Sequence, residues 1–207
     1  MTRPVALCVF CSSSEGIDPS YVELAATVGG ALAARGWGLV SGGGSVSMMG
    51  AVARAARAGG ARTVGVIPRR LVDAEVADHD ADELVVTDGM RERKGVMDAR
   101  ADAFLALPGG IGTLEELLEV WVARSLGMHG KPVVVLDPDG LYDPLRRLVG
   151  SLVDAGFVRE SAATLDIVWA TGVDDALDAV AARLAPARPT GPAAGAKRDE
   201  EYLEAQP

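Results

Sequence analysis

The segment AFLALPGGIGTLEELLEV (residues 103–120) joins three patterns that together describe a strand, a turn and a helix. Residues 103–107 form an apolar run of the length expected for a buried strand. The turn PGGIGT follows with three glycines, and residues 113–127 then show the apolar spacing of a helix. A strand that leads through a short turn into a helix is the repeating unit of a parallel α/β sheet.

The same alternation of short apolar runs and longer amphipathic segments continues along the whole chain. Several of the runs are apolar throughout, which is typical of strands covered by helices on both faces of a sheet. The pattern predicts an α/β fold with a doubly wound, mainly parallel, Rossmann-like sheet. We expect strands at residues 4–10, 38–41, 63–67, 83–87, 103–107, 132–137 and 166–170, and helices near residues 19–35, 46–58, 90–100, 113–127, 142–155 and 173–184.

Composition and charge limit the function classes. The chain has 207 residues, 49% of them apolar, and a formal net charge of −9. We expect one domain over residues 1–185 and a disordered tail, residues 186–207, which is rich in Pro, Ala, Gly and charge. The negative charge argues against a nucleic-acid partner, and no apolar run is long enough to span a membrane. The apolar run at residues 4–10 is too short for a signal peptide, so we expect a cytoplasmic protein.

Cys8 and Cys11 form a C-x-x-C pair at the end of the first predicted strand. A structural zinc site would need two more ligands, and the two histidines, His79 and His129, stand alone in the sequence. We interpret the cysteines as two reduced thiols and expect no metal site.

Two predicted strands, residues 38–41 and 103–107, each lead into a glycine-rich turn. Carboxyl ends of parallel strands meet at one edge of a sheet, where ligands of this fold class bind. Gly42–Gly44 and Gly109–Gly112 would either turn the corner or present backbone N–H groups to an anion at a helix start. The presence of both turns at one edge favours a phosphate site.

The type of phosphate ligand is restricted by the lysines and by the turn pattern. A P-loop closes with Lys followed by Ser or Thr, but neither turn contains one of the three lysines, Lys94, Lys131 and Lys197. The turn at residues 42–47 reads G-x-G-x-x-S, which is close to a dinucleotide fingerprint. NADP binding therefore remains an alternative, with Arg69 nearby after the next strand.

Two carboxylates begin the helix after the second turn. Thr113-x-x-Glu116 fits a capping box, which would stabilise the helix start by about 1 kcal/mol without any chemistry. Glu115 would also be favourable next to the positive end of the helix dipole. Spacing alone slightly favours this structural explanation over a catalytic carboxylate.

The predicted helix at residues 90–100 carries Arg91, Arg93 and Lys94. An exposed, charged helix with methionines on its core face explains these residues by themselves. The alternative is that this helix borders the binding crevice, because it directly precedes the strand that leads into PGGIGT.

Three motifs together, SGGGSVSMMG (residues 41–50), MRERKGVM (90–97) and LPGGIGTLEELLEVW (107–121), resemble the LONELY GUY family. These proteins are cytokinin riboside 5′-monophosphate phosphoribohydrolases that were long labelled lysine decarboxylases. The resemblance covers about residues 5–184. It implies hydrolysis of the N-glycosidic bond of N6-substituted adenosine 5′-monophosphates to free base and ribose 5-phosphate, without a metal or organic cofactor. It also implies a homodimer with the site near the interface.

The resemblance assigns residues to roles in this reaction. It implies that Arg93 and Glu116 are catalytic, with Glu116 stabilising the cationic ribose or activating water. Arg93 would hold phosphate or position Glu116. A non-catalytic nucleotide-binding or carrier protein of the same fold remains the alternative. The implied substrate contacts are Glu75, Lys94, Gly110, Ile111, Gly112, Thr113, Leu114 and Glu115, with Gly43, Gly44 and Gly109 at the phosphate.

The sequence departs from the family pattern at three positions. Ser12 stands where the family's first loop commonly has Gly, Ser47 replaces a Gly in the second turn, and Val122 replaces a Thr after the glutamate pair. The last change bears on base recognition. The decarboxylase label has no support, because a pyridoxal phosphate enzyme needs a Schiff-base lysine and Lys94 belongs to the Arg-Lys pair.

Overall fold

The computed structural model describes residues 3–72 and 76–185. These residues form a seven-stranded sheet whose pairings are all parallel, in the order β4-β3-β2-β1-β5-β6-β7. The predicted doubly wound α/β fold is therefore confirmed. The strands are β1 (Ala6–Phe10), β2 (Gly38–Ser41), β3 (Thr63–Pro68), β4 (Glu83–Thr87), β5 (Ala103–Ala106), β6 (Val133–Leu136) and β7 (Val168–Ala170).

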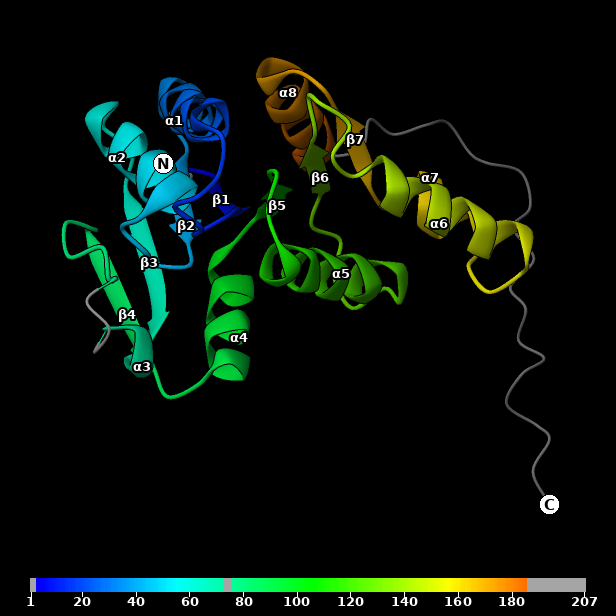
Figure 1. The fold of residues 1–207 in the computed structure, drawn as a ribbon, viewed down its shortest axis with the longest axis horizontal. Coiled ribbons are helices and arrows are strands. Elements are labelled where there is room, and N and C mark those ends of the chain that lie inside the picture. The colour runs from blue at the N-terminus through cyan, green and yellow to red at the C-terminus, as the bar shows by residue number, and fades with distance from the viewer. Residues whose placement is uncertain (1–2, 73–75, 186–207) are drawn as a thin grey trace.

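Helices cover both faces of this sheet (Figure 1). One layer contains α1, α2 and α8, and the other contains α4 and α5. The helices are α1 (Pro19–Ala34), α2 (Ser47–Ala58), α3 (Arg69–Val72), α4 (Met90–Arg100), α5 (Ile111–Ser125), α6 (Asp143–Asp154), α7 (Glu160–Thr164) and α8 (Val173–Leu184).

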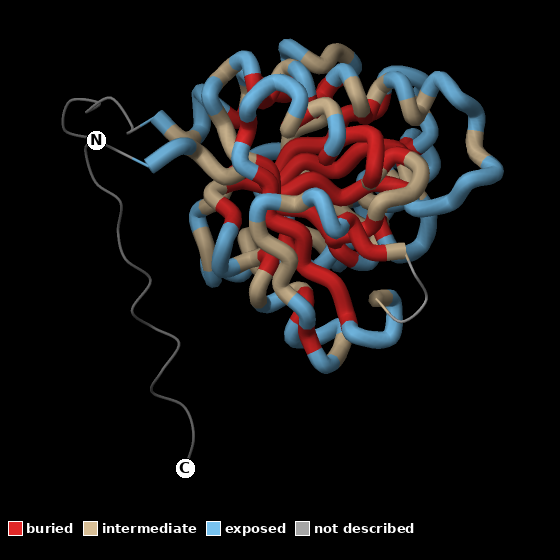
Figure 2. The backbone as a smooth tube through the Cα atoms, turned by 90° about the vertical axis from the view of Figure 1, so that its left-hand side faces the viewer, coloured by how far each residue is buried: buried red, intermediate tan, exposed pale blue. Residues whose placement is uncertain are grey.

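Burial of the strands on both faces explains their apolar sequences. In β1, Leu7 and Val9 belong to the core under α1, α2 and α8, while Cys8 and Phe10 belong to the core under α4 and α5. Figure 2 shows the buried strands at the centre of the molecule, with exposed segments around them. The two cysteines are free and buried, as interpreted from the sequence. No helix in the described part of the chain is long and apolar enough to cross a membrane.

The predicted elements agree closely with the observed ones. The N-terminus of α1 has a local signal, because Asp18 caps the helix by accepting a hydrogen bond from Ser20 N at 2.9 Å and Pro19 follows it. The short helices α3 and α7 were not predicted, since four and five residues carry too little periodicity. The predicted tail, residues 186–207, lies outside the described residues.

The strand order brings the important turns together. β1 has β2 on one side and β5 on the other, so the chain reverses its direction of winding between β1 and β5. Crevices at such a reversal are the usual ligand sites of open α/β sheets. The serine-rich loop after β1 and the two glycine turns after β2 and β5 therefore meet at one edge.

Candidate active site

A pocket of about 470 Å³ lies at this edge of the sheet. The loop after β1, both glycine turns, the first turns of α4 and α5, and residues around α3 contribute to it. It brings together most of the chemistry predicted for the site. Its lining residues from the glycine turns and the two helices are Gly42, Gly44, Met90, Arg93, Gly110, Gly112, Thr113, Glu115 and Glu116.

Arg93 and Glu116 form a buried ion pair at the floor of the pocket. Arg93 Nη1 donates to Glu116 Oε1 at 2.6 Å, and Arg93 Nε donates to the carbonyl of Val66 on β3 at 3.0 Å. The two side chains are only 6% and 9% exposed. The guanidinium thus has two internal acceptors, and its position relative to the carboxylate is defined by contacts from both α5 and β3.

The surroundings of Glu116 favour its protonated form more than water does. Burial raises the pKa of this carboxyl above its ordinary value, and the positive charge and hydrogen bond of Arg93 oppose the effect. A carboxylate whose pKa is raised by burial, and which lies next to a cation, is suited to proton transfer. The pair can therefore accept a proton from water or stabilise a nearby positive charge.

Gly42 makes room for the Arg93 guanidinium. A Cβ atom on this glycine would lie 1.9 Å from Arg93 Nη2, far inside van der Waals contact. The first glycine turn thus has a function that its sequence alone did not indicate. It lets an arginine from α4 pass close to the backbone after β2 and reach Glu116 on α5.

Two structural explanations considered from the sequence are wrong. The capping box is absent, because α5 begins at Ile111 with Gly110 as N-cap and has no side-chain cap. Glu116 therefore lies in the second turn of the helix, where it binds Arg93 instead of a backbone N–H. Nor is α4 simply an exposed charged helix: Met97 lies on its core face as expected, but Arg93 is buried as well.

The start of α5 is open to the pocket. The first N–H groups of a helix have no partner within it, and here Gly110, Gly112 and Thr113 line the cavity. The turn before them is held by Tyr142, whose hydroxyl donates to the carbonyl of Leu107 at 2.9 Å. The second glycine turn thus presents uncapped backbone donors and the positive end of a 15-residue helix to a ligand.

The other predicted phosphate contacts have partners within the protein. Gly43 N donates to Ser41 Oγ at 3.3 Å, and Gly44 N lies 3.1 Å from Met49 Sδ. Gly43 has a φ of +73° and lies against the backbone of β3, so it is required for the turn itself. Gly109 is packed against Thr113. Their role at a phosphate stays a prediction.

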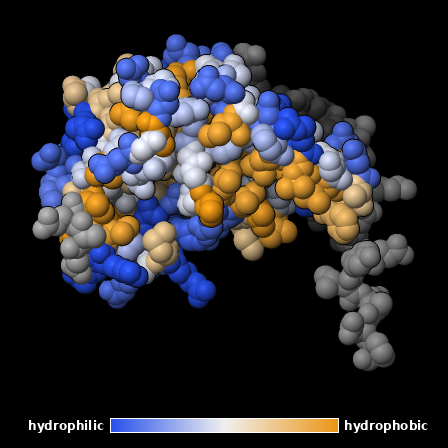
Figure 3. Space-filling model, viewed as in Figure 1, coloured by the Kyte–Doolittle hydropathy of each residue, from blue (hydrophilic) through white to orange (hydrophobic). Residues whose placement is uncertain are grey.

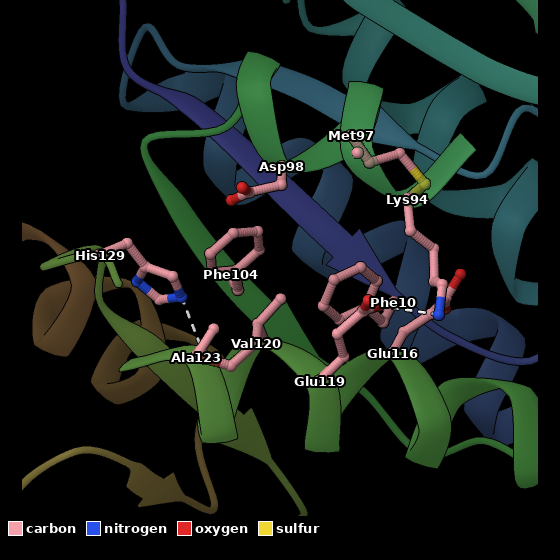
Figure 4. A pocket seen from close by; sticks show the side chains of 11 residues that line it. Phe10, Lys94, Met97, Asp98, Phe104, Glu116, Glu119, Val120, Ala123 and His129 are labelled. Atoms are coloured by element: carbon pink, nitrogen blue, oxygen red, sulfur yellow. Dashed lines mark hydrogen bonds and ion pairs between the residues drawn. The ribbon is translucent and has the colours of Figure 1, made fainter. Parts of the chain in front are cut away.

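Lys94 points away from the pocket. Its ammonium is bound by Glu115. It is also bound by Glu119 Oε2, at 2.9 Å (Figure 4). These hydrogen bonds raise the pKa of Lys94, so the amine is held in its charged form. The second lysine of the described residues, Lys131, binds Asp98 at 2.7 Å. A Schiff-base lysine must be a free amine, so neither position suits pyridoxal phosphate.

The remaining predicted contacts have different surroundings. Ile111 is 87% exposed, and Leu114 packs against the core under α4 and α5 instead of facing the pocket. Glu75 lies outside the described residues. Reasoning from the sequence missed the apolar wall of the pocket, where Met90 and Leu71 contribute exposed side chains. The signal for Met90 was its place three residues before Arg93, on the same face of α4.

The three departures from the family pattern have distinct structural settings. Ser12 lines the pocket, and its Oγ accepts a hydrogen bond from Ser14 N at 3.0 Å. Ser47 has a φ of +50°, the left-handed region that favours glycine. Its hydroxyl donates to Ser14 O at 2.5 Å. Val122 lies on the exposed face of α5, away from the pocket.

Comparison with known proteins identifies the family. The family model described as "Possible lysine decarboxylase" matches residues 49–180. A Mycobacterium marinum protein named cytokinin riboside 5′-monophosphate phosphoribohydrolase is 57% identical over 84% of this chain and 91% of its own. A Mycobacterium tuberculosis protein of the same name is 54% identical over 87% of this chain and 96% of its own. The molybdenum cofactor carrier protein of Chlamydomonas reinhardtii, 26% identical, superposes with a TM-score of 0.68 over 89% of this chain and all of its own. The chain belongs to the LONELY GUY family of cytokinin riboside 5′-monophosphate phosphoribohydrolases, which the family model describes as possible lysine decarboxylases.

Proposed function

We propose that this protein hydrolyses the N-glycosidic bond of adenosine 5′-monophosphates, including N6-substituted ones, and releases the free base and ribose 5-phosphate. The observation that carries this proposal is the buried Arg93–Glu116 pair at the floor of a pocket whose rim is the open start of α5. The identity to the two mycobacterial phosphoribohydrolases supports the same activity.

The 5′-phosphate binds at the start of α5. Backbone N–H groups near Gly110, Gly112 and Thr113 have no intrahelical acceptors, and the helix dipole adds positive potential there. Glu116 follows one turn further along the same helix. A phosphate held at the helix start therefore places the ribose next to the carboxylate, which lowers the entropic part of the barrier.

The reaction breaks the bond between C1′ of the ribose and the base nitrogen. The bond electrons leave with the base, and positive charge develops on the ribose. Glu116, as a carboxylate, stabilises this charge and takes a proton from the water that attacks C1′. The proton on Glu116 then passes to the departing base, directly or through water, so that free base and ribose 5-phosphate result and the carboxylate is restored. Arg93 positions Glu116, because its Nε and Nη1 are both occupied by protein acceptors.

The base faces the apolar side of the pocket. Ile67, Leu71, Val76 and Met90 are among the apolar residues that line the pocket. Apolar side chains favour the face of a purine and an apolar N6 substituent over a polar group. The pocket thus combines a polar end for phosphate with an apolar end for the base.

We also propose that two copies of the chain associate through an apolar face of α5, α6 and the residues that follow α6. Figure 3 shows apolar residues gathered over α5 and α6. A groove of about 320 Å³ crosses this face, and Phe157 beside it is 81% exposed. Large exposed apolar patches mark interaction sites. Sedimentation of the wild type should detect dimers, and Leu126→Glu and Phe157→Glu should each weaken them. If the wild type and both variants all sediment as monomers, the proposal is contradicted.

Incubation with three compounds tests the enzymatic proposal. We expect release of free base from isopentenyladenosine monophosphate and from AMP, but not from the unphosphorylated riboside, which has no anion for the start of α5. No release from either monophosphate, or equal release from the riboside, contradicts the proposal. The Chlamydomonas protein is named a carrier. A non-catalytic carrier predicts saturable nucleotide binding without any free base.

A further inference from the structure

An apolar slot separates α4 from α5 on the face of the sheet (Figure 4). It has a volume of about 150 Å³, and its floor includes Phe10 and Phe104, whose stacked rings have centroids 5.8 Å apart. Met97 from α4 and Val120 from α5 are among its walls. Because a space remains between the helices here, apolar packing alone does not define their relative position.

Ion pairs bridge the two helices at one end of the slot. Arg93 on α4 binds Glu116 on α5, and its neighbour Lys94 binds both Glu115 and Glu119 on α5. Two adjacent cations on one helix thus meet three carboxylates on the other. Lys94 is the more constrained partner in its pairs, with a side chain only 18% exposed against about half for each carboxylate.

The two carboxylates that bind Lys94 face different spaces. Glu115 lines the nucleotide pocket, whereas Glu119 lines the slot, one helical turn further along α5. Lys94 lines the slot as well. A ligand in the pocket can therefore reach Glu115 directly, while Glu119 holds the ammonium from the side that the ligand does not occupy.

We infer that Glu119 is a positioning residue for base release, an inference that rests on the proposed function. When a nucleotide enters the pocket and Glu115 turns toward it, Glu119 keeps the Lys94 ammonium bound to α5. Lys94 directly follows Arg93 in α4, so this contact keeps Arg93 within hydrogen-bonding distance of Glu116. Glu119 itself touches neither the substrate nor the reacting atoms.

Kinetics of Glu119→Gln test this role. The variant keeps the size of the side chain and removes its charge, and Glu115 still holds Lys94 in the free protein. We expect a melting temperature close to wild type, a KM within about twofold, and a kcat lower by about tenfold, as for a small misplacement of a catalytic group. Glu119→Asp restores most of the rate, because the long Lys94 side chain can follow the shorter carboxylate. The matched control is Glu83→Gln, which removes a carboxylate bound by Arg62 and Arg100 far from the pocket and leaves kcat unchanged.

A double variant separates this role from a general effect on stability. If Glu119 acts through Lys94, the double variant Lys94→Gln/Glu119→Gln has the kcat of Lys94→Gln alone. The inference is overturned if the kcat losses of the two single variants multiply in the double variant. It is also overturned if Glu119→Gln has the wild-type kcat. A uniform loss of activity that follows the melting temperature and that Glu119→Asp does not correct overturns it as well.

A structure with a bound AMP analogue whose glycosidic bond cannot be hydrolysed provides a readout that needs no turnover. In the wild type we expect Lys94 on Glu119 and the Arg93–Glu116 contact near its 2.6 Å in the free protein. In Glu119→Gln with the same analogue, we expect this contact to be lengthened but not broken, in keeping with the roughly tenfold loss in kcat. Lys94 bound elsewhere in the wild-type complex overturns the inference. Absence of base release by the wild type instead contradicts the proposed function, and the two failures remain distinguishable.

Discussion

Replacing Gly42 by alanine adds one methyl group, with no polar or charged atom, and should disable the site. The added Cβ would lie 1.9 Å from Arg93 Nη2, whereas ordinary contact begins at 3.4 Å. The guanidinium must therefore retreat by the difference, about 1.5 Å. Gly42 is not among the glycines with positive φ, so alanine introduces no backbone strain. The effect of the substitution is confined to Arg93 and to Met49, whose flexible Cε lies 3.1 Å from the added atom.

A retreat of this size breaks the 2.6 Å hydrogen bond between Arg93 and Glu116. A misplacement of about 1 Å at a reacting group can reduce the rate by about 100-fold, and we expect at least this loss in kcat for Gly42→Ala. We expect Gly42→Ala to lose about 1–3 kcal/mol of stability. This loss is smaller than for a fully buried unpaired charge, because the guanidinium can turn toward the open pocket. Free base measured by chromatography and a thermal melt follow the two effects separately.

Gly30→Ala is the matched control for this experiment. Gly30 lies within α1, and no atom lies within 4 Å of the Cβ that alanine would add. Alanine in a helix is better than glycine by about 0.8 kcal/mol, so this variant should melt slightly higher and keep full activity. A Gly42→Ala enzyme with near wild-type turnover would refute the reasoning, because Arg93 would then not need its observed position. A crystal structure of the variant would show whether the arginine has moved.

Four further results are expected. Glu116→Gln should reduce turnover by about 100- to 10,000-fold while costing only about 1 kcal/mol, because the amide oxygen still accepts from Arg93; full activity would exclude Glu116 as the catalytic carboxylate. Since burial raises the pKa of Glu116, the acid limb of the kcat profile should lie above the ordinary glutamate value of 4.5, with activity lost as pH falls through it. The same raised pKa gives stability that is present below 4.5 and lost as pH rises through the folded value, a trend that Glu116→Gln should abolish in denaturant titrations. Ser47→Gly should leave stability nearly unchanged, since relief of about 1 kcal/mol of backbone strain offsets the hydrogen bond to Ser14 O, whereas Ser47→Ala should lose about 1 kcal/mol in the same melts.

The likeness to a carrier protein illustrates why the site matters more than the fold. A shared α/β sheet hosts many unrelated functions, so the TM-score by itself supports neither hydrolysis nor transport. The buried carboxylate in the pocket is what distinguishes the two for this chain. A carrier has no need for an arginine that positions an acid beside a phosphate site, and it should tolerate Gly42→Ala with unchanged nucleotide affinity.

The sequence by itself determined the elements of the fold and the edge of the sheet where the pocket lies. Strands of three to six mainly apolar residues depend on neighbours along the chain, so a local pattern reveals them. The order of strands and helices then implied a parallel sheet, and the two glycine turns marked its carboxyl edge. The motifs also carried a family resemblance that the comparisons confirm.

Only the tertiary structure decided which of these residues act together. By its spacing, Thr113-x-x-Glu116 fits a capping box as well as it fits a catalytic role for Glu116. The structure decides between the two, because α5 starts two residues earlier than predicted and Glu116 points toward Arg93 on α4. Arg93 and Glu116 are 23 positions apart on separate helices. The space that Gly42 leaves, and the outward turn of Lys94 toward Glu119, likewise depend on how α4 and α5 dock on the sheet. Spacing along the chain encodes hydrogen bonding within an element, but contacts between elements follow from packing in three dimensions.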